Sequence, residues 1–167
     1  FYNLELFVSP GVLIPRPETE QLVHLVLEEN RGTHKKVLDI GTGSGCIALA
    51  LKTAWNESTI TACDISEEAL EVARKNAKDL SINVDFYQTD ILTNEIAAYD
   101  ILVSNPPYIS LSEKDTMHKN VIENEPHLAL FVADKDPLIF YKRIIQLAEK
   151  QRAICYFETS EFYRTSL

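Results

Sequence analysis

The sequence of 167 residues lacks the features that mark membrane, secreted and metal-binding proteins. No apolar run approaches the roughly 20 residues that a membrane-spanning helix needs, and the first residues do not have the arrangement of a secretion signal. The cysteines are odd in number and far apart, which argues against disulfides, and neither they nor the histidines have metal-ligand spacing. We therefore predict a cytoplasmic protein without a metal, in which the cysteines are small buried hydrophobic residues: Cys46, Cys63 and Cys155.

Clusters of positive charge are missing too. The formal net charge is −9, and no lysine or arginine cluster is larger than Lys35-Lys36. A protein whose main task is to bind a polyanion usually carries a basic stripe that displaces counterions. Direct binding of nucleic acid is therefore not expected, although the charge alone does not exclude it. The length fits one domain with a real core, and we expect a monomer.

The sequence does contain alternating strand-like and helix-like segments, which are typical of an α/β domain with a doubly wound, mostly parallel sheet. Strands are predicted at Lys36–Ile40, Thr59–Asp64 and residues 84–87, 99–104 and 153–158. Helices are predicted to start at Pro17, after the glycine loop and after Ser66, with others over residues 137–149 and near residues 113–121. Ser66 is a good N-cap, and the helix after it has one apolar stripe, formed by Leu70, Ala73, Ala77 and Leu80.

Both ends of the sequence indicate a truncated domain. The chain opens in an apolar, strand-like segment over residues 4–8 and stops shortly after the last predicted strand. We expect a strand or linker over residues 1–16 and a Rossmann-like core over residues 17–167, with an edge of the sheet missing.

Residues 39–45 read Asp-Ile-Gly-Thr-Gly-Ser-Gly, directly after the first predicted strand and before a helix. Glycine permits a tight turn and lets a ligand approach the backbone, and a helix start offers free N–H groups. A dinucleotide-binding loop would have glycine where Cys46 stands. The ammonium group of S-adenosylmethionine, by contrast, suits an acid in this place. We predict cofactor contacts from this loop at Asp39, Gly41, Thr42, Gly43 and Gly45.

Acidic residues also follow the next two strands. Asp64 can accept hydrogen bonds from both ribose hydroxyls, and Asp90 can accept a hydrogen bond from the adenine amine. A local role remains open for each acid, as a strand-end cap or the neighbour of a helix start. Ligands of open α/β sheets bind outside the carboxyl ends of the strands, so three acids there favour a binding site. The further predicted cofactor contacts are Asp64, Ile65, Asp90, Ile91 and Asn105.

The tetrapeptide Asn105-Pro106-Pro107-Tyr108 follows the fourth predicted strand. In a doubly wound sheet the first and fourth strands are neighbours, so we expect this loop to face the glycine loop. The prolines fix the backbone and remove two N–H donors, which leaves carbonyl oxygens free to accept. The Asn105 Oδ1 atom and the Pro106 carbonyl can each take one N–H of a planar nitrogen, so its lone pair aims along the methyl–sulfur axis. Tyr108 can stack on the planar group. Catalysis would then be positioning rather than proton abstraction, and we predict that all four residues are catalytic.

This motif alone leaves adenine N6 and a glutamine amide both open as acceptors. Residues 12–20, 37–48 and 104–109, with Glu125-Pro126 and Ala129-Leu130, closely resemble the peptide-chain release factor glutamine methyltransferases of the PrmC/HemK family. The resemblance covers essentially the whole chain. It implies an S-adenosylmethionine-dependent methyltransferase fold and transfer of a methyl group to the glutamine of the Gly-Gly-Gln motif in release factors, with S-adenosylhomocysteine as product.

The resemblance also implies individual roles. Asn105 and Pro106 would bind the glutamine amide, Tyr108 would line its pocket, and the Pro-Arg-Pro-Glu-Thr-Glu segment would pack beside the site. Whether Arg16 and Glu18 act directly or only start a helix is open, as is the role of Glu125. The helical N-terminal domain and the terminal hairpin of the family are absent, so we expect weak activity from this chain alone.

Two other functions compete with this one. An adenine-N6 methyltransferase would carry a basic groove, which the composition does not provide. A nucleotide-binding module without catalysis would not need residues 105–108 intact.

Overall fold

The computed structural model describes residues 1–31, 34–110, 126–132 and 135–159. A sheet of 5 parallel strands has the order β3-β2-β1-β4-β7. Along the chain its strands are β1 (Lys36–Ile40), β2 (Thr59–Asp64), β3 (Asp85–Gln88), β4 (Ile101–Ser104) and β7 (Ile154–Phe157). The predicted parallel sheet is therefore confirmed, and β4 lies beside β1 as expected. A second, short sheet pairs β5 (Ile109–Ser110) with β6 (Phe131–Val132).

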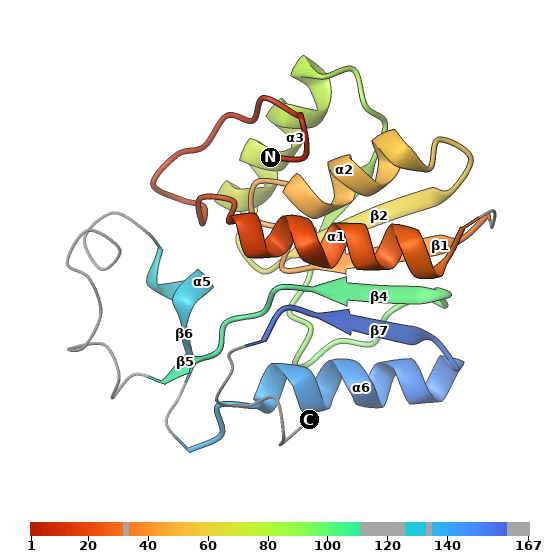
Figure 1. The fold of residues 1–167 in the computed structure, drawn as a ribbon. Coiled ribbons are helices and arrows are strands. Elements are labelled where there is room, and N and C mark those ends of the chain that lie inside the picture. The colour runs from red at the N-terminus through yellow and green to blue at the C-terminus, as the bar shows by residue number, and fades with distance from the viewer. Residues whose placement is uncertain (32–33, 111–125, 133–134, 160–167) are drawn as a thin grey trace.

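Helices cover both faces of the large sheet, as the doubly wound fold requires. The helices α1 (Pro17–Glu29), α2 (Cys46–Ala54) and α3 (Glu67–Asp79) lie on one face, and α6 (Ile139–Gln151) lies on the other (Figure 1). The short α5 (His127–Leu130) precedes β6. The sheet has a hydrophobic core on each face, and alternate residues of β1 contribute to the two cores. Val37 packs with α1 and α2, whereas Leu38 and Ile40 pack with α6.

Most predicted elements are present, with boundaries displaced by a few residues at most. The strands β1 and β2 have the predicted bounds, and α1 begins at Pro17. The Ser66 hydroxyl caps α3 by accepting from the Ala69 N–H at 3.2 Å. Of the predicted stripe on α3, Leu70, Ala73 and Ala77 are buried. The helix expected near residues 113–121 lies outside the described residues.

Residues 4–8 do not form a strand, so of the strand or linker expected over residues 1–16, the strand is not observed. The Asn76 side chain takes the place of a partner strand: its Oδ1 accepts from the Phe7 N–H at 2.8 Å, and its Nδ2 donates to the Phe7 carbonyl at 2.9 Å. Leu4 and Leu6 pack against the core on the α1 and α2 side. Phe7 and Val8 are exposed, so the apolar pattern reflects partial burial of Leu4 and Leu6, while the backbone polar groups of Phe7 are satisfied by a side chain.

Two of the cysteines are buried as predicted. Burial raises the pKa of the Cys46 and Cys63 thiols to about 12, so both are uncharged packing groups at neutral pH. Cys155 is only half-buried, and burial raises its pKa to about 11. Among the described residues, no helix has the length and apolar character to cross a membrane.

Candidate functional site

A cavity of about 540 Å³ lies at the carboxyl ends of β1, β2 and β4 and beyond the end of β3. It is where an open parallel sheet binds its ligands. Most of the predicted site residues line it: Gly41, Gly43, Asp64, Ile65, Asp90, Ile91, Asn105, Pro106 and Pro107. Four do not: Asp39, Thr42, Gly45 and Tyr108.

The glycine loop holds the end of β1 against the end of β2. The backbone N–H groups of Gly41 and Thr42 both donate to the Cys63 carbonyl, at 2.9 and 3.0 Å. Gly41 and Gly43 have positive φ, of 70° and 55°, and a Cβ atom on either would meet nothing within 4 Å. Because both line the cavity, their missing side chains leave room for a ligand against the backbone.

Gly45 has a different role in the same loop. Its φ is 84°, and a Cβ there would lie 3.2 Å from the Ala73 Cβ and 3.3 Å from Leu49 Cδ1. Gly45 therefore lets the start of α2 pack closely on α3. The predicted cofactor contact at Gly45 stays a prediction, since this residue does not line the cavity.

Asp64 has the geometry of a hydroxyl-binding carboxylate. Its Oδ2 accepts from the Gly43 N–H at 2.9 Å and its Oδ1 from the Ser66 N–H at 3.0 Å. Burial raises its pKa above the ordinary value, although backbone hydrogen bonds from Ser66 and Gly43 oppose this. Each oxygen has a further lone pair, so the side chain can still accept from two vicinal hydroxyls of a ribose. The residues present thus fit S-adenosylmethionine.

Asp39 lies beneath the loop and is fully buried. Because side chains alternate along β1, it points with Val37 toward α2 rather than with Ile40 toward the cavity. Its Oδ2 accepts from the Thr42 hydroxyl at 2.6 Å and from the Ala48 N–H at 3.2 Å. Burial raises the pKa of Asp39 to about 7. Its predicted contact with the cofactor ammonium stays a prediction.

The raised pKa makes stability depend on pH. The folded chain holds the Asp39 proton more tightly than the unfolded chain, in which the pKa is near 3.8. The contribution of this group to the free energy of unfolding is therefore fully present below pH 4 and is lost as pH rises through about 7, by roughly 4 kcal/mol in all. We expect Asp39→Asn to remove this slope.

Chemical denaturation of both proteins between pH 4 and 8 would measure the difference. Identical pH profiles would contradict the prediction. Saturating S-adenosylhomocysteine should also reduce the slope of the wild-type pH profile if its ammonium group neutralises the Asp39 carboxylate. This measurement tests the predicted contact between Asp39 and the cofactor.

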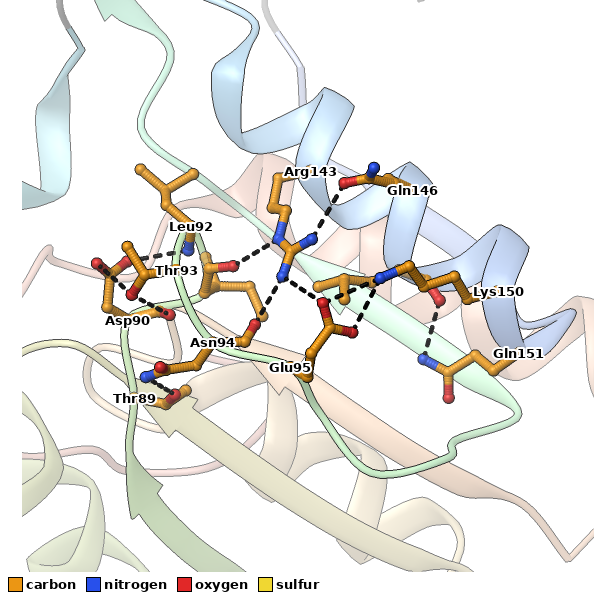
Figure 2. Close-up of polar contacts among 12 residues, drawn as sticks. Thr89, Asp90, Leu92, Thr93, Asn94, Glu95, Arg143, Gln146, Lys150 and Gln151 are labelled. Carbon is orange, nitrogen blue, oxygen red and sulfur yellow. Dashed lines mark hydrogen bonds and ion pairs between the residues drawn. The ribbon is translucent and has the colours of Figure 1, made fainter.

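The loop after β3 is tied to α6 by one arginine. Arg143 donates from Nε to the Ile91 carbonyl at 3.0 Å and from Nη2 to the Asn94 carbonyl at 2.8 Å (Figure 2). It also forms an ion pair with Glu95 at 3.2 Å, which Lys150 shares at 2.9 Å. The Arg143 side chain is 15% exposed, so these contacts are partly shielded from water. The guanidinium therefore holds the backbone that carries Asp90 and Ile91.

We expect Arg143→Met to weaken binding of S-adenosylhomocysteine by about 5- to 10-fold, because the loop would have to be ordered on binding. Lys150→Met is the matched control: it removes a neighbouring cation that contacts Glu95 but no loop carbonyl, and its affinity should stay within about twofold. Isothermal titration calorimetry measures both. Equal losses in the two variants would show that surface charge, not the loop, is responsible.

The Asn-Pro-Pro-Tyr loop leaves β4 beside the glycine loop, as predicted from the strand order. Asn105 Nδ2 donates to the Thr19 hydroxyl at 3.3 Å, and that hydroxyl donates to Glu158 Oε2 at 2.6 Å. The Asn105 amide also lies near enough to the Glu158 carboxylate to lower its pKa. Thr19 lies in α1, and Glu158 directly follows β7. Burial raises the pKa of Glu158, and the Thr19 hydrogen bond opposes this.

Tyr108 does not line the cavity, and the charges of Arg16, Glu18 and Glu158 act on its hydroxyl. Burial raises the pKa of its hydroxyl; the negative charges of Glu158 and then Glu18 add to this, while Arg16 opposes it. The first turn of α1 and its N-cap Arg16 therefore lie beside the predicted acceptor pocket. Direct roles for Arg16 and Glu18 stay open, and Glu125 lies outside the described residues.

Sequence reasoning missed part of the cavity wall. The segment before α1 contributes Pro10, Gly11, Val12 and Leu13, and α6 contributes Phe140 and Ile144. Val12 is buried against Ala69 and Val72 of α3. A Cβ on Gly11 would lie 2.5 Å from Glu68 Oε1, so this glycine lets the segment pass close to α3. The apolar Val12-Leu13 pair was the available signal, but its contact with the cavity depends on the tertiary fold.

Comparison with known proteins identifies close relatives. The sequence model described as "Methyltransferase small domain" matches residues 18–129. The "Release factor glutamine methyltransferase" of Bacteroides thetaiotaomicron is 48% identical over 162 residues, which cover 93% of this chain and 58% of that protein. The protein of the same name from Streptococcus pneumoniae is 52% identical over 146 residues, or 87% of this chain and 52% of that protein. The chain thus spans a little over half the length of these curated relatives.

Solved structures share the fold at lower identity. The hMettl16 catalytic domain in complex with the MAT2A 3′UTR hairpin 6 superposes with a TM-score of 0.69 at 21% identity, covering 89% of this chain and 58% of that one. The human methyltransferase 10 domain containing protein has a TM-score of 0.61 at 22% identity, covering 91% and 68%. These similarities show a Rossmann-like methyltransferase fold, which agrees with the fold class predicted from the sequence.

Proposed function

We propose that this chain, which belongs to the Methyltransferase small domain family, is the catalytic domain of a release factor glutamine methyltransferase. The observation that carries the proposal is that Asn105 and Pro106 line the same cavity as Gly41 and Gly43 of the glycine loop. The names of relatives at 48 and 52% identity support the choice of substrate. A release factor substrate would place the reaction in the cytoplasm.

S-adenosylmethionine, when bound, supplies a methyl group activated by the sulfonium. Asp64 would accept from its ribose hydroxyls, and Asp90 with Ile91 would hold its adenine. Gly41 and Gly43 would allow its amino-acid part to lie against the loop. All five residues line the same cavity.

The acceptor nitrogen is a weak nucleophile because its lone pair is delocalised into the amide. Asn105 Oδ1 and the Pro106 carbonyl would each accept one N–H, which turns the lone pair toward the methyl group and favours the sp³ character that develops during transfer. The N–CH₃ bond forms as the S–CH₃ bond breaks, and the nitrogen then loses a proton. A side-chain base is not required, since the methylated amide is acidic before it loses that proton.

The adenine-N6 alternative shares this chemistry and differs in its substrate. The net charge of −9 makes a polyanion an unfavourable partner. The RNA in the hMettl16 structure belongs to a protein only 21% identical to this chain, and that similarity concerns the fold. A monomeric state, the absence of nucleic-acid binding and the division at residue 17 stay predictions.

The test is transfer of radiolabelled methyl from S-adenosylmethionine to a purified release factor. A release factor with Gly-Gly-Gln changed to Gly-Gly-Ala and a DNA duplex are the controls. Label in the intact release factor alone is the expected result. Label in the DNA would instead support the adenine alternative, and label in the Gly-Gly-Ala protein would move the reaction to another residue.

A further inference from the structure

We propose that Thr19 and Glu158 are positioning residues that fix which end of the Asn105 amide faces the substrate. The inference rests on the proposed function, because it assigns Oδ1 of Asn105 as the atom that accepts from the acceptor nitrogen. Neither Thr19 nor Glu158 lines the cavity. They act through Asn105, from α1 and from the end of β7.

The number of protons on each group fixes the direction of these hydrogen bonds. An ionised carboxylate can only accept, so at the 2.6 Å contact between Thr19 Oγ1 and Glu158 Oε2 the hydroxyl must donate. A threonine hydroxyl has one proton, and that proton is then used. Toward Asn105, 3.3 Å away, Thr19 Oγ1 can therefore only accept. The group of Asn105 on this side must be the donor, Nδ2.

The Glu158 carboxylate favours the same orientation, since the Asn105 amide lies near enough to it to lower its pKa. Because the Asn105 Nδ2 atom faces α1 and β7, the Oδ1 atom is the end of the amide that faces the cavity, which Asn105 lines. The reversed amide would place Oδ1 against two acceptors and offer the substrate N–H a donor. That orientation cannot bind the nitrogen to be methylated.

The burial and anchoring of the two residues suit this role. Thr19 is 2% exposed, so water does not compete for its hydroxyl. Glu158 is held through its backbone as well: its N–H donates to the Ser104 carbonyl at 3.1 Å, and its carbonyl accepts from the Tyr141 hydroxyl at 3.0 Å. The carboxylate is thus fixed relative to β4, the strand that Asn105 follows.

Matched variants at Thr19 separate positioning from packing. Thr19→Val keeps the shape and loses the hydroxyl, and Thr19→Ser keeps the hydroxyl. We expect kcat for methyl transfer to a release factor to fall about 10- to 100-fold in the valine variant and to stay within about threefold in the serine variant. Glu158→Gln, which can donate as well as accept, should also lower kcat. The affinity for S-adenosylhomocysteine should be unchanged in all three.

Thr53→Val is the matched control: it makes the same change at a threonine of α2 whose hydroxyl donates to the Leu49 carbonyl at 2.8 Å, and it should keep the wild-type kcat. A lower melting temperature with an unchanged kcat in Thr19→Val would show that the Thr19–Glu158 contact only joins α1 to β7, and would overturn the proposal.

A second readout does not depend on the substrate. In ¹⁵N-labelled wild-type protein, the Asn105 side-chain NH₂ protons should exchange slowly with solvent, and in Thr19→Val they should exchange faster. The Asn105 signals are identified by their loss in Asn105→Asp. Fast exchange in the wild type would overturn the inference. Slow exchange in a protein that methylates the DNA duplex and no release factor would refute the proposed function and leave the amide orientation standing.

Discussion

Replacing Asn105 with alanine should lower kcat for methyl transfer by about 100- to 1000-fold, in the range seen when one preorganised polar group is removed from an active site. The variant loses the acceptor that orients the amide nitrogen, and the Pro106 carbonyl alone leaves the nitrogen free to rotate. Binding of S-adenosylhomocysteine should change far less, since Asp64 and the glycine loop are intact. Steady-state kinetics with a release factor, together with calorimetry for the product, measure the two effects.

Asn56→Ala is the matched control for Asn105→Ala. Asn56 lies in the exposed turn between α2 and β2, and the contact recorded for it uses its backbone carbonyl, which accepts from Lys52. The control should keep the wild-type kcat. If kcat of Asn105→Ala stayed within threefold of the wild-type value, Asn105 would not be a catalytic residue. The main support for the proposed function would then be lost.

Replacing Asp64 with alanine should weaken S-adenosylhomocysteine binding at least 100-fold. Two hydrogen bonds to a charged, partly buried carboxylate contribute about 1.5–3 kcal/mol each, and the variant loses both contacts with the ribose. Asp64→Asn keeps one acceptor oxygen and should lose about tenfold. Calorimetric titration with S-adenosylhomocysteine measures the affinities.

The alanine variant also removes the acceptor for the Gly43 and Ser66 N–H groups, so its melting temperature without ligand must be compared with that of the wild type. Asp79→Ala, at the exposed end of α3, removes an acid that pairs only with Lys75 among the contacts recorded for it, and its affinity should not change. Equal affinities for Asp64→Ala and wild type would contradict ribose binding by this residue.

The strands could be predicted because local pattern and tertiary environment agree there. Residues 37–40 are buried on both faces of the sheet, so they are apolar apart from one acid. The segment over residues 4–8 is just as apolar, but only Leu4 and Leu6 are partly buried, and a side chain, Asn76, pairs with the Phe7 backbone instead of a strand. An apolar pattern does not specify the partner of the backbone, so it could not distinguish a strand from a linker here.

The sequence by itself determined the glycine loop, the acids at the strand ends and the Asn-Pro-Pro-Tyr motif, because each consists of residues adjacent in the chain and depends on local backbone chemistry. The tertiary structure alone decided which of these residues face the cavity. Asp39 and Gly45 belong to the same loop as Gly43, yet strand alternation turns Asp39 toward α2, and Gly45 packs on α3.

The same holds for the group that orients Asn105. Thr19 and Glu158 are 139 residues apart, and neither stands out in a pattern read along the chain. Folding brings α1 and the end of β7 next to the residue that follows β4, so that the Thr19 and Glu158 side chains lie beside the Asn105 amide. A contact of this kind depends on three separate elements and their packing, and no local spacing in the sequence encodes it.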